Sequence, residues 1–153
     1  MSEPLRLTVL KKILAQLAAA KRYGSEDDPA ATAYFQTAKR GRLAVGCDKP
    51  AVLLARDSWR SSQRGGVDSV KHAMRCYIAV FLGNPDQNSA TVGDELEYAT
   101  ATVERVMEFD KELRRLCRIT PLGGVDGMVE AGHPVADVVM AYLVEYERAR
   151  GNP

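Results

Sequence analysis

The chain has 153 residues, of which 46% are hydrophobic and 27% are charged, and its formal net charge is +1. A chain of this length fits one domain, which buries about 68–70% of the surface that the unfolded form exposes and needs no metal or disulfide to fold. The small net charge excludes a strong global attraction to nucleic acid or acidic membranes, and no apolar run approaches the roughly 20 residues that span a bilayer.

The first expected element is an amphipathic helix over residues 5–17. Its apolar side chains recur at helical spacing, and most positions between them are polar. Ser2 is the expected N-cap, Pro4 suits the first turn, and Gly24, which follows two basic residues, is expected to stop the helix.

Two short strands are expected next, over residues 33–39 and 51–55, with a basic turn between them. Residues 57–70 are rich in Ser, Arg, Gln and Gly, which predicts a long exposed loop or a protruding hairpin. Arg and Trp are enriched at protein interfaces, and Arg also pairs with phosphate, so an interface, a nucleic-acid contact and a solvated loop all stay open. The candidate interface residues of these two regions are Lys39, Arg40, Arg42, Trp59, Arg60 and Arg64.

Strict alternation predicts a strand over residues 72–82. One face is expected to be core and carries Met74, Cys76, Ile78, Val80 and Leu82. The other face carries Tyr77 and Phe81 beside Arg75. Because large exposed apolar patches mark interaction sites, Tyr77 and Phe81 join the candidate interface, unless a helix of the same chain covers this face.

The last third of the chain predicts a helix and two strands. Residues 94–116 keep helical spacing, with acidic residues at the start and arginines at the end, as the helix dipole favours. A strand over 118–130, interrupted at 122–124, is expected to pair with a long alternating strand over 135–147. Residues 148–153 are expected to form a flexible tail.

These elements predict one α+β domain over residues 1–147. Its sheet is expected to be mixed, mainly antiparallel and four- to five-stranded, with two main helices packed on one face. The other face would then meet solvent or a partner.

Little in the chain suggests catalysis. His72 and His133 have no carboxylate or thiol at ligand spacing, and the three cysteines, Cys47, Cys76 and Cys117, lack the spacing of a zinc or redox site. The Gly-x-Ser-x-Gly context of a nucleophile and the Lys-Ser/Thr ending of a phosphate loop are absent from the sequence. We therefore predict a protein without catalytic residues, metal or cofactor, whose thiols stay reduced and mostly buried in a reducing cytoplasm or in an assembly made there.

Several residue runs occur in a characteristic order along residues 5–146. They are the turn Gly41-Arg42, the strand opening DKPAVLL at 48–54, the strand ending YIAVF at 77–81, the helical run VMEFDKEL at 106–113, a Gly-Gly turn, and the closing VEY at 144–146. Together they resemble the tail terminator, or minor tail protein, family of long-tailed bacteriophages and prophages.

The resemblance implies a mixed sheet with helices on one face, assembled as a hexameric ring in the virion, at the head-proximal end of the tail tube. The implied partners are further copies of the chain, the tail tube protein and a head-completion or neck protein, with no membrane. Specific nucleic-acid binding is not implied, although the genome would pass through the ring.

Other functions stay open from the sequence. A head-completion or connector protein of the phage neck would share the size, the order of elements and the lack of catalytic groups. A small nucleic-acid-binding domain would use Arg40, Arg42, Arg60 and Arg64 and would bind DNA with a steep salt dependence. An enzyme is the weakest alternative, and loss of a measured activity on mutation of His133 or Asp126 would support it.

Overall fold

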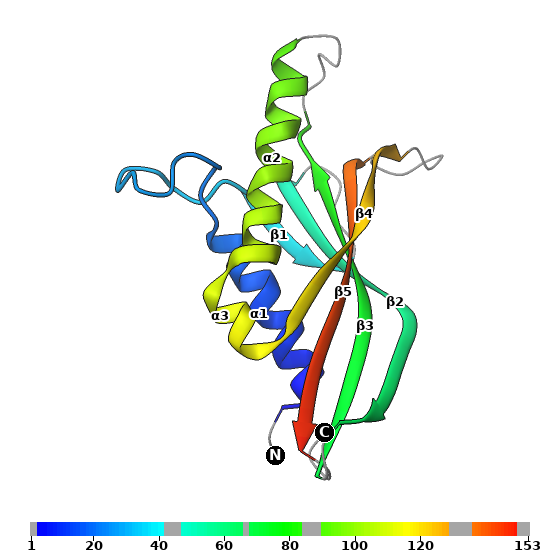
Figure 1. Cartoon of the computed structure of the whole chain (residues 1–153). Helices are drawn as coiled ribbons and strands as arrows, with labels where there is room; N and C mark the ends of the chain where they lie inside the picture. Colours follow the sequence, from blue (N-terminus) through cyan, green and yellow to red (C-terminus); the bar gives the residue numbers. More distant parts are fainter. Residues whose placement is uncertain (1–2, 42–46, 66–67, 84–89, 129–135, 150–153) are drawn as a thin grey trace.

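The computed structural model describes residues 3–41, 47–65, 68–83, 90–128 and 136–149, without the side chains of 58–59, 90–93 and 125–128 (Figure 1). Its elements are α1 (Leu5–Ala19), β1 (Thr37–Arg40), β2 (Ala51–Arg64), β3 (Ser69–Phe81), α2 (Ala90–Phe109), α3 (Lys111–Leu116), β4 (Arg118–Met128) and β5 (Ala136–Ala149). The strands form one sheet in the order β1-β2-β3-β5-β4. The pair β1–β2 is parallel and the other pairs are antiparallel, which confirms the predicted α+β fold with a mixed, mainly antiparallel sheet.

The core lies between the helices and one face of the sheet. Side chains alternate along a strand, and the positions of β3 and β5 that face this core are buried at every second residue. In Figure 1, α1, α2 and α3 lie on the same side of the sheet. The largest buried side chains of this layer include Ile13 and Leu17 of α1, Met74 and Ile78 of β3, Leu113 of α3, and Tyr142 of β5.

The helix α1 confirms the first predicted element but ends before the predicted stop. The chain leaves the helix at Ala20, whose carbonyl accepts a hydrogen bond from the backbone N–H of Tyr34 at 2.8 Å. An isolated bridge between Lys21 and Ala33 follows directly. The chain is therefore extended from Ala20, four residues before Gly24. The prediction that Gly24 stops the helix is wrong. The expected N-cap, Ser2, lies outside the described residues, and Pro4 occupies the N-cap position without a side-chain bond.

Residues 21–33 form an arm that projects from the body of the fold (Figure 1). Contacts with α2 hold its base. Arg22 pairs with Glu95 at 2.6 Å, and Arg105 donates a hydrogen bond to the backbone oxygen of Lys21, also at 2.6 Å. The buried hydroxyl of Thr102 accepts from the N–H of Tyr23 at 3.0 Å. These bonds fix the direction of the arm, which the sequence indicates only as a polar, turn-rich stretch.

The region predicted as a loop is a strand hairpin. β2 continues to Arg64 and pairs with β3 as far as Arg64↔Val70, so the hairpin alternative is confirmed and the loop alternative is wrong. A register shift between Arg56 and Arg60 interrupts this pairing. The first predicted short strand is also displaced, because β1 begins only at Thr37.

The last two strands follow the prediction closely, including the interruption of β4 between Pro121 and Gly123. Gly123 has a φ of +122°, a conformation that glycine adopts readily. The strand β5 extends to Ala149, so Arg148 belongs to the sheet and not to a tail. Residues 150–153 of the expected tail lie outside the described residues.

The helix predicted over residues 94–116 is two helices, α2 and α3, divided at Asp110. The Asp110 carboxylate accepts a hydrogen bond from the N–H of Leu113 at 3.0 Å, so Asp110 is the N-cap of α3. Its second oxygen accepts from Gln16 of α1 at 2.8 Å. A side chain that bonds nearby backbone competes with continuation of the helix, which explains the division.

We expect Asp110→Ala to lower the free energy of unfolding by about 1 kcal/mol, because it removes an N-cap, and by somewhat more because it also removes the bond to Gln16. Asp110→Asn is the control, since asparagine caps helices about as well as aspartate. Urea denaturation of the three proteins measures the difference. Equal losses in both variants would contradict a capping role.

Candidate functional site

The face of the sheet opposite the helices is named here the open face, because no described helix lies over it. It is formed by the alternate strand positions that point away from the core: Leu53, Ala55 and Asp57 of β2, Ala73, Arg75, Tyr77 and Ala79 of β3, and Val139, Ala141, Leu143 and Glu145 of β5. All of these side chains are half-buried. The centre of the open face is apolar across three adjacent strands.

A polar cluster lies beside this apolar centre. The hydroxyl of Tyr77 donates to the Asp57 carboxylate at 2.9 Å, and Nε of Arg75 lies 2.8 Å from the same oxygen. The hydrogen bond to Asp57 raises the pKa of Tyr77, because the bond requires the protonated phenol. These contacts orient Tyr77 on the open face, where the sequence predicts it.

Phe81 does not share the exposure of Tyr77. It is 7% exposed and packs in a small cluster with Ala51 and Ala136, against which Cys47 and Val139 also lie. The expectation that Phe81 forms part of an accessible patch is therefore wrong. It lies at the end of β3, where Cys47, which precedes β2, packs against the same cluster.

The basic candidates are divided between different parts of the sheet. Lys39 and Arg40 are exposed on β1, at the edge of the sheet, while Arg60 and Arg64 are exposed on the distal part of β2. Arg42 and the side chain of Trp59 lie outside the described residues. The structure therefore does not describe how Trp59 lies relative to Arg60 and Arg64, whereas it does describe the side chains around Arg60.

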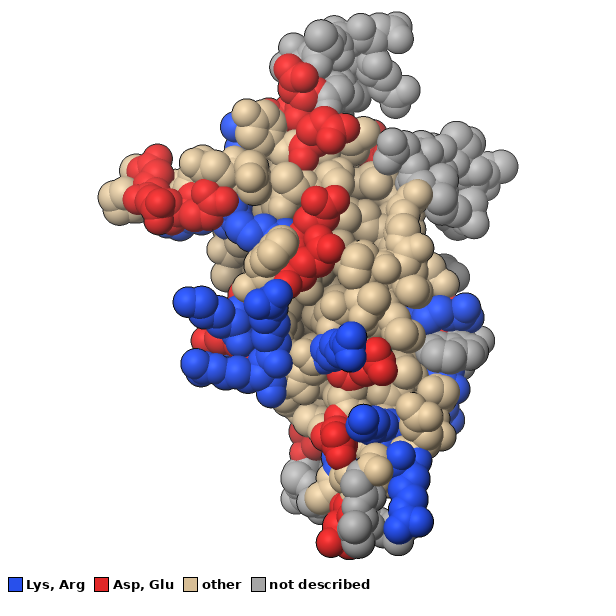
Figure 2. All heavy atoms as spheres, viewed as in Figure 1, with Lys and Arg blue, Asp and Glu red and all other residues tan. Residues whose placement is uncertain are grey.

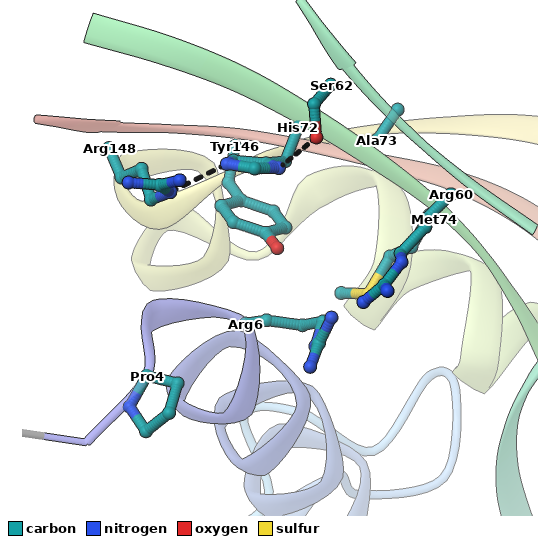
Figure 3. Close-up of a pocket in the computed structure, with 9 residues that line it drawn as sticks. All are labelled: Pro4, Arg6, Arg60, Ser62, His72, Ala73, Met74, Tyr146 and Arg148. Atoms are coloured by element: carbon teal, nitrogen blue, oxygen red, sulfur yellow. Dashed lines mark hydrogen bonds between the residues drawn. The ribbon is translucent and has the colours of Figure 1, made fainter. Parts of the chain in front are cut away.

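Arg60 lines a hollow of about 200 Å³ between the N-terminus of α1 and the distal halves of β2, β3 and β5 (Figure 3). This arginine hollow, as it is named from here on, is bordered by Arg6, Arg60, Arg148, Ser62, His72 and Tyr146, together with smaller contributions from Pro4, Ala73 and Met74. The described residues of its wall include three arginines and no carboxylate. The hollow is therefore strongly cationic.

His72 connects one side of the arginine hollow by hydrogen bonds. Nε of Arg148 donates to Nε2 of His72 at 2.7 Å, and Ser62 Oγ lies 2.9 Å from Nδ1. Because an Arg N–H can only donate, Nε2 carries no proton, and the proton of the neutral ring is on Nδ1, from which it is donated to Ser62. The ring also stacks on Tyr146, with ring centroids 5.3 Å apart.

The surroundings of His72 favour this neutral form. Burial lowers the pKa of His72, and the positive charges of Arg148, Arg6 and Arg60 lower the pKa further. Burial raises the pKa of Tyr146, although Arg6 and Arg148 oppose the rise. Both rings are thus uncharged at neutral pH, and neither cancels the charge of the arginines.

A second hollow of about 430 Å³ adjoins the first, since Pro4 and Arg6 line both. Its other charged lining residues are Arg40 and Arg56. Arg6 therefore lies between the arginine hollow and the second hollow, which Arg40 and Arg56 also line.

Sequence reasoning finds Arg60 and Arg40 but not their neighbours. Arg6 is one polar position of an amphipathic helix, and Arg148 is assigned to the tail. The signal that could find Arg148 is the strand register, which places Arg148 opposite Val70 and Tyr146 opposite His72. That register depends on a pairing of residues more than seventy positions apart. Arg6 lies on α1, so only the packing of that helix against the sheet brings it to the hollow.

The cysteines show the character of structural thiols. Cys76 and Cys117 are buried and free, and burial raises the pKa of Cys76 to about 12 and that of Cys117 to about 11. Cys47 is free and half-buried. Within the described ranges, no three His, Cys, Asp or Glu side chains come together as a metal site would require. The described helices likewise include none that is both long and apolar enough to cross a membrane.

Charge is separated on the helix side of the molecule. Figure 2 shows acidic side chains on the arm, where Glu26, Asp27 and Asp28 are exposed, and basic side chains over the region of α3, where Lys111, Arg114 and Arg115 are exposed. The molecule thus presents two separate patches of opposite sign in addition to the open face.

No protein-family model matches the chain, and no curated protein matches it.

We expect acid to destabilise the protein through His72. The unfolded chain takes up a proton at His72 near pH 6.5, whereas the folded chain does so only at lower pH, because its pKa is lowered. The stabilising contribution is therefore complete above about pH 6.5 and is lost as pH falls towards the folded pKa. Urea denaturation between pH 5 and 8 measures this loss.

The matched variant for this prediction is His72→Gln, whose amide can accept from Arg148 and donate to Ser62 but does not titrate. The difference in unfolding free energy between wild type and variant should change with pH below about 6.5. A constant difference over the whole range would show that His72 is not held neutral by the fold.

Proposed function

We propose that the chain is a structural subunit of the tail terminator type, which assembles with further copies of itself into a ring at the end of a phage tail tube. The order of sequence motifs that resembles this family supports the proposal. The observation that carries it is the open face, a three-stranded surface with an apolar centre.

The open face has the composition of an interface. Its apolar centre is bordered by charged side chains, including the Asp57–Arg75 pair and Glu145. Stable interfaces commonly combine a desolvated apolar core with a polar rim. Covering this centre by another subunit would remove apolar surface from water, a favourable contribution that must exceed the entropy cost of association.

Ring closure imposes a further requirement, because head-to-tail contacts need two different and complementary patches on each subunit. The acidic arm and the basic surface of α3 supply patches of opposite sign at separate places. Complementary charges of this kind favour correct encounter and suppress wrong partners.

In this proposal the ring acts mechanically. One side binds the last ring of tail tube subunits and prevents further addition, and the opposite side presents a surface to a head-completion or neck protein. The chain would then be located in the virion, and the action would require no catalytic group, cofactor or metal.

Electron microscopy of the purified protein mixed with tail tubes tests the proposal. Rings seated at one end of the tubes, together with tubes that no longer elongate when tube protein is added, are the expected result. Rings that bind only isolated head connectors would instead identify another neck component. Tubes that remain bare and continue to elongate would overturn the terminator function.

A paired substitution tests the role of the open face. Ala141→Asp places a charge at its centre, opposite Tyr77 in β3 and Gly123 in β4, while Ala15→Asp places the same charge on an exposed position of α1. We expect Ala141→Asp to reduce ring formation at least tenfold, because a buried unpaired carboxylate opposes association. Ala15→Asp should form rings as the wild type does.

Analytical ultracentrifugation measures the assembly of both variants, and thermal unfolding of dilute protein shows whether each is folded. Normal rings from a folded Ala141→Asp protein would exclude the open face as a contact between copies.

A further inference from the structure

We propose that the arginine hollow is a binding site for a phosphate group, and that the adjoining arginines extend it along a chain of phosphates. The inference does not depend on ring formation or on the open face. It depends on the charge, the shape and the hydrogen-bonding groups of the hollow.

Charge is the first argument. Neither Arg6 nor Arg60 forms an ion pair with a described residue, and in Figure 3 both side chains reach towards the same space. Two guanidinium groups that converge on one space repel each other, because both carry a positive charge. An anion between them would turn this repulsion into attraction. Their convergence without a carboxylate in the described wall therefore indicates an anionic ligand.

The hydrogen-bonding groups match an oxyanion with several oxygens. The planar fork of Arg fits phosphate oxygens with paired N–H donors, and such charge-assisted bonds are among the stronger ones in proteins. Ser62 accepts the proton of His72 Nδ1, so its own hydroxyl proton can be donated to a ligand. Arg148 is oriented on the wall of the hollow by its bond to His72.

The amount of charge favours phosphate over a carboxylate. Three arginines border a space of about 200 Å³. A single carboxylate carries one negative charge, whereas a phosphate monoester carries close to two and a phosphodiester chain carries one on each of its successive phosphates. A ligand with more than one phosphate charge therefore uses more of the donors that the hollow provides than one carboxylate does.

The second hollow favours a chain of phosphates over a single phosphate. Arg6 lines both hollows, and Arg40 and Arg56 continue the positive surface beyond it. A lone phosphate would reach one hollow only. Successive phosphates of a nucleic acid backbone would meet arginines in both, so the arrangement favours a phosphodiester chain as the source of the phosphate.

Two probes test the site: a fluorescent duplex DNA of 20 base pairs followed by anisotropy, and inorganic phosphate followed by calorimetry. The DNA should bind at low salt, with log affinity falling linearly against log salt by about 0.9 for each phosphate contacted. Inorganic phosphate should bind weakly and should compete with the DNA.

The double variant Arg6→Gln/Arg60→Gln removes the converging charges, and Lys111→Gln/Arg115→Gln removes two exposed charges from α3 as a matched control. We expect the first variant to weaken both probes at least tenfold and to lower the salt slope by about two. The control should change either quantity less than threefold. The control should keep the wild-type melting temperature, and Arg6→Gln/Arg60→Gln should melt no lower than the wild type, because Arg60 is exposed, Arg6 is half-buried and their mutual repulsion is removed.

Each outcome decides the matter. Binding of both probes that depends on Arg6 and Arg60 supports the phosphodiester site, and binding of inorganic phosphate alone supports the phosphate site with a small phosphorylated molecule as its source. Failure of both probes at low salt, equal losses in the control variant, or equal competition by polyglutamate at matched charge would overturn the proposal.

Discussion

The antiparallel pairing of β3 with β5 runs without interruption from Ser69↔Ala149 to Val80↔Val138, and most other features of the fold depend on it. The pairing aligns two strands whose buried residues alternate in step, so that Met74, Cys76 and Ile78 lie beside Val144, Tyr142 and Met140 under the helices. A slip of one residue would turn these side chains to the open face and expose polar ones to the core. The same register fixes the composition of the open face and brings Tyr146 beside His72.

Much of this arrangement can be predicted because local pattern and tertiary environment agree. Residues 72–82 and 135–147 alternate in the sequence because one face of each strand is buried, and α1 shows helical spacing because one side of it packs on the sheet. The distal part of β2 has no such signal. The side chains of Arg60 and Ser62 line the arginine hollow, and Arg64 is exposed, so none of them packs in an apolar core. This part of β2 is therefore a strand without hydrophobic alternation. The division at Asp110 is hidden for another reason, since apolar residues at helical spacing continue on both sides of it.

The cationic site was not predictable as a unit. Arg6, Arg60 and Arg148 come from a helix and two strands far apart in the sequence, and each has an ordinary local context. Only the packing of the first turn of α1 against the end of the sheet places them around one space. A related reason explains Phe81. Alternation along β3 gives the face on which Tyr77 and Phe81 lie but not what covers each of them, so it does not show that Phe81 is buried.

The irregular pairing of β2 has a geometric consequence for the placement of charge. Between Arg56 and Arg60 the strand advances four positions while β3 advances two, from Cys76 to Met74. β2 thus contains two more residues than β3 over this stretch. Because side chains alternate between the faces of a strand, an even number of extra residues leaves Arg60 on the same side of the sheet as Arg56. An odd number of extra residues would place the remaining side chains of β2 on the opposite face of the sheet. Length changes in this stretch are thus tolerable in steps of two, and a single added or lost residue would invert the polarity of half the hairpin.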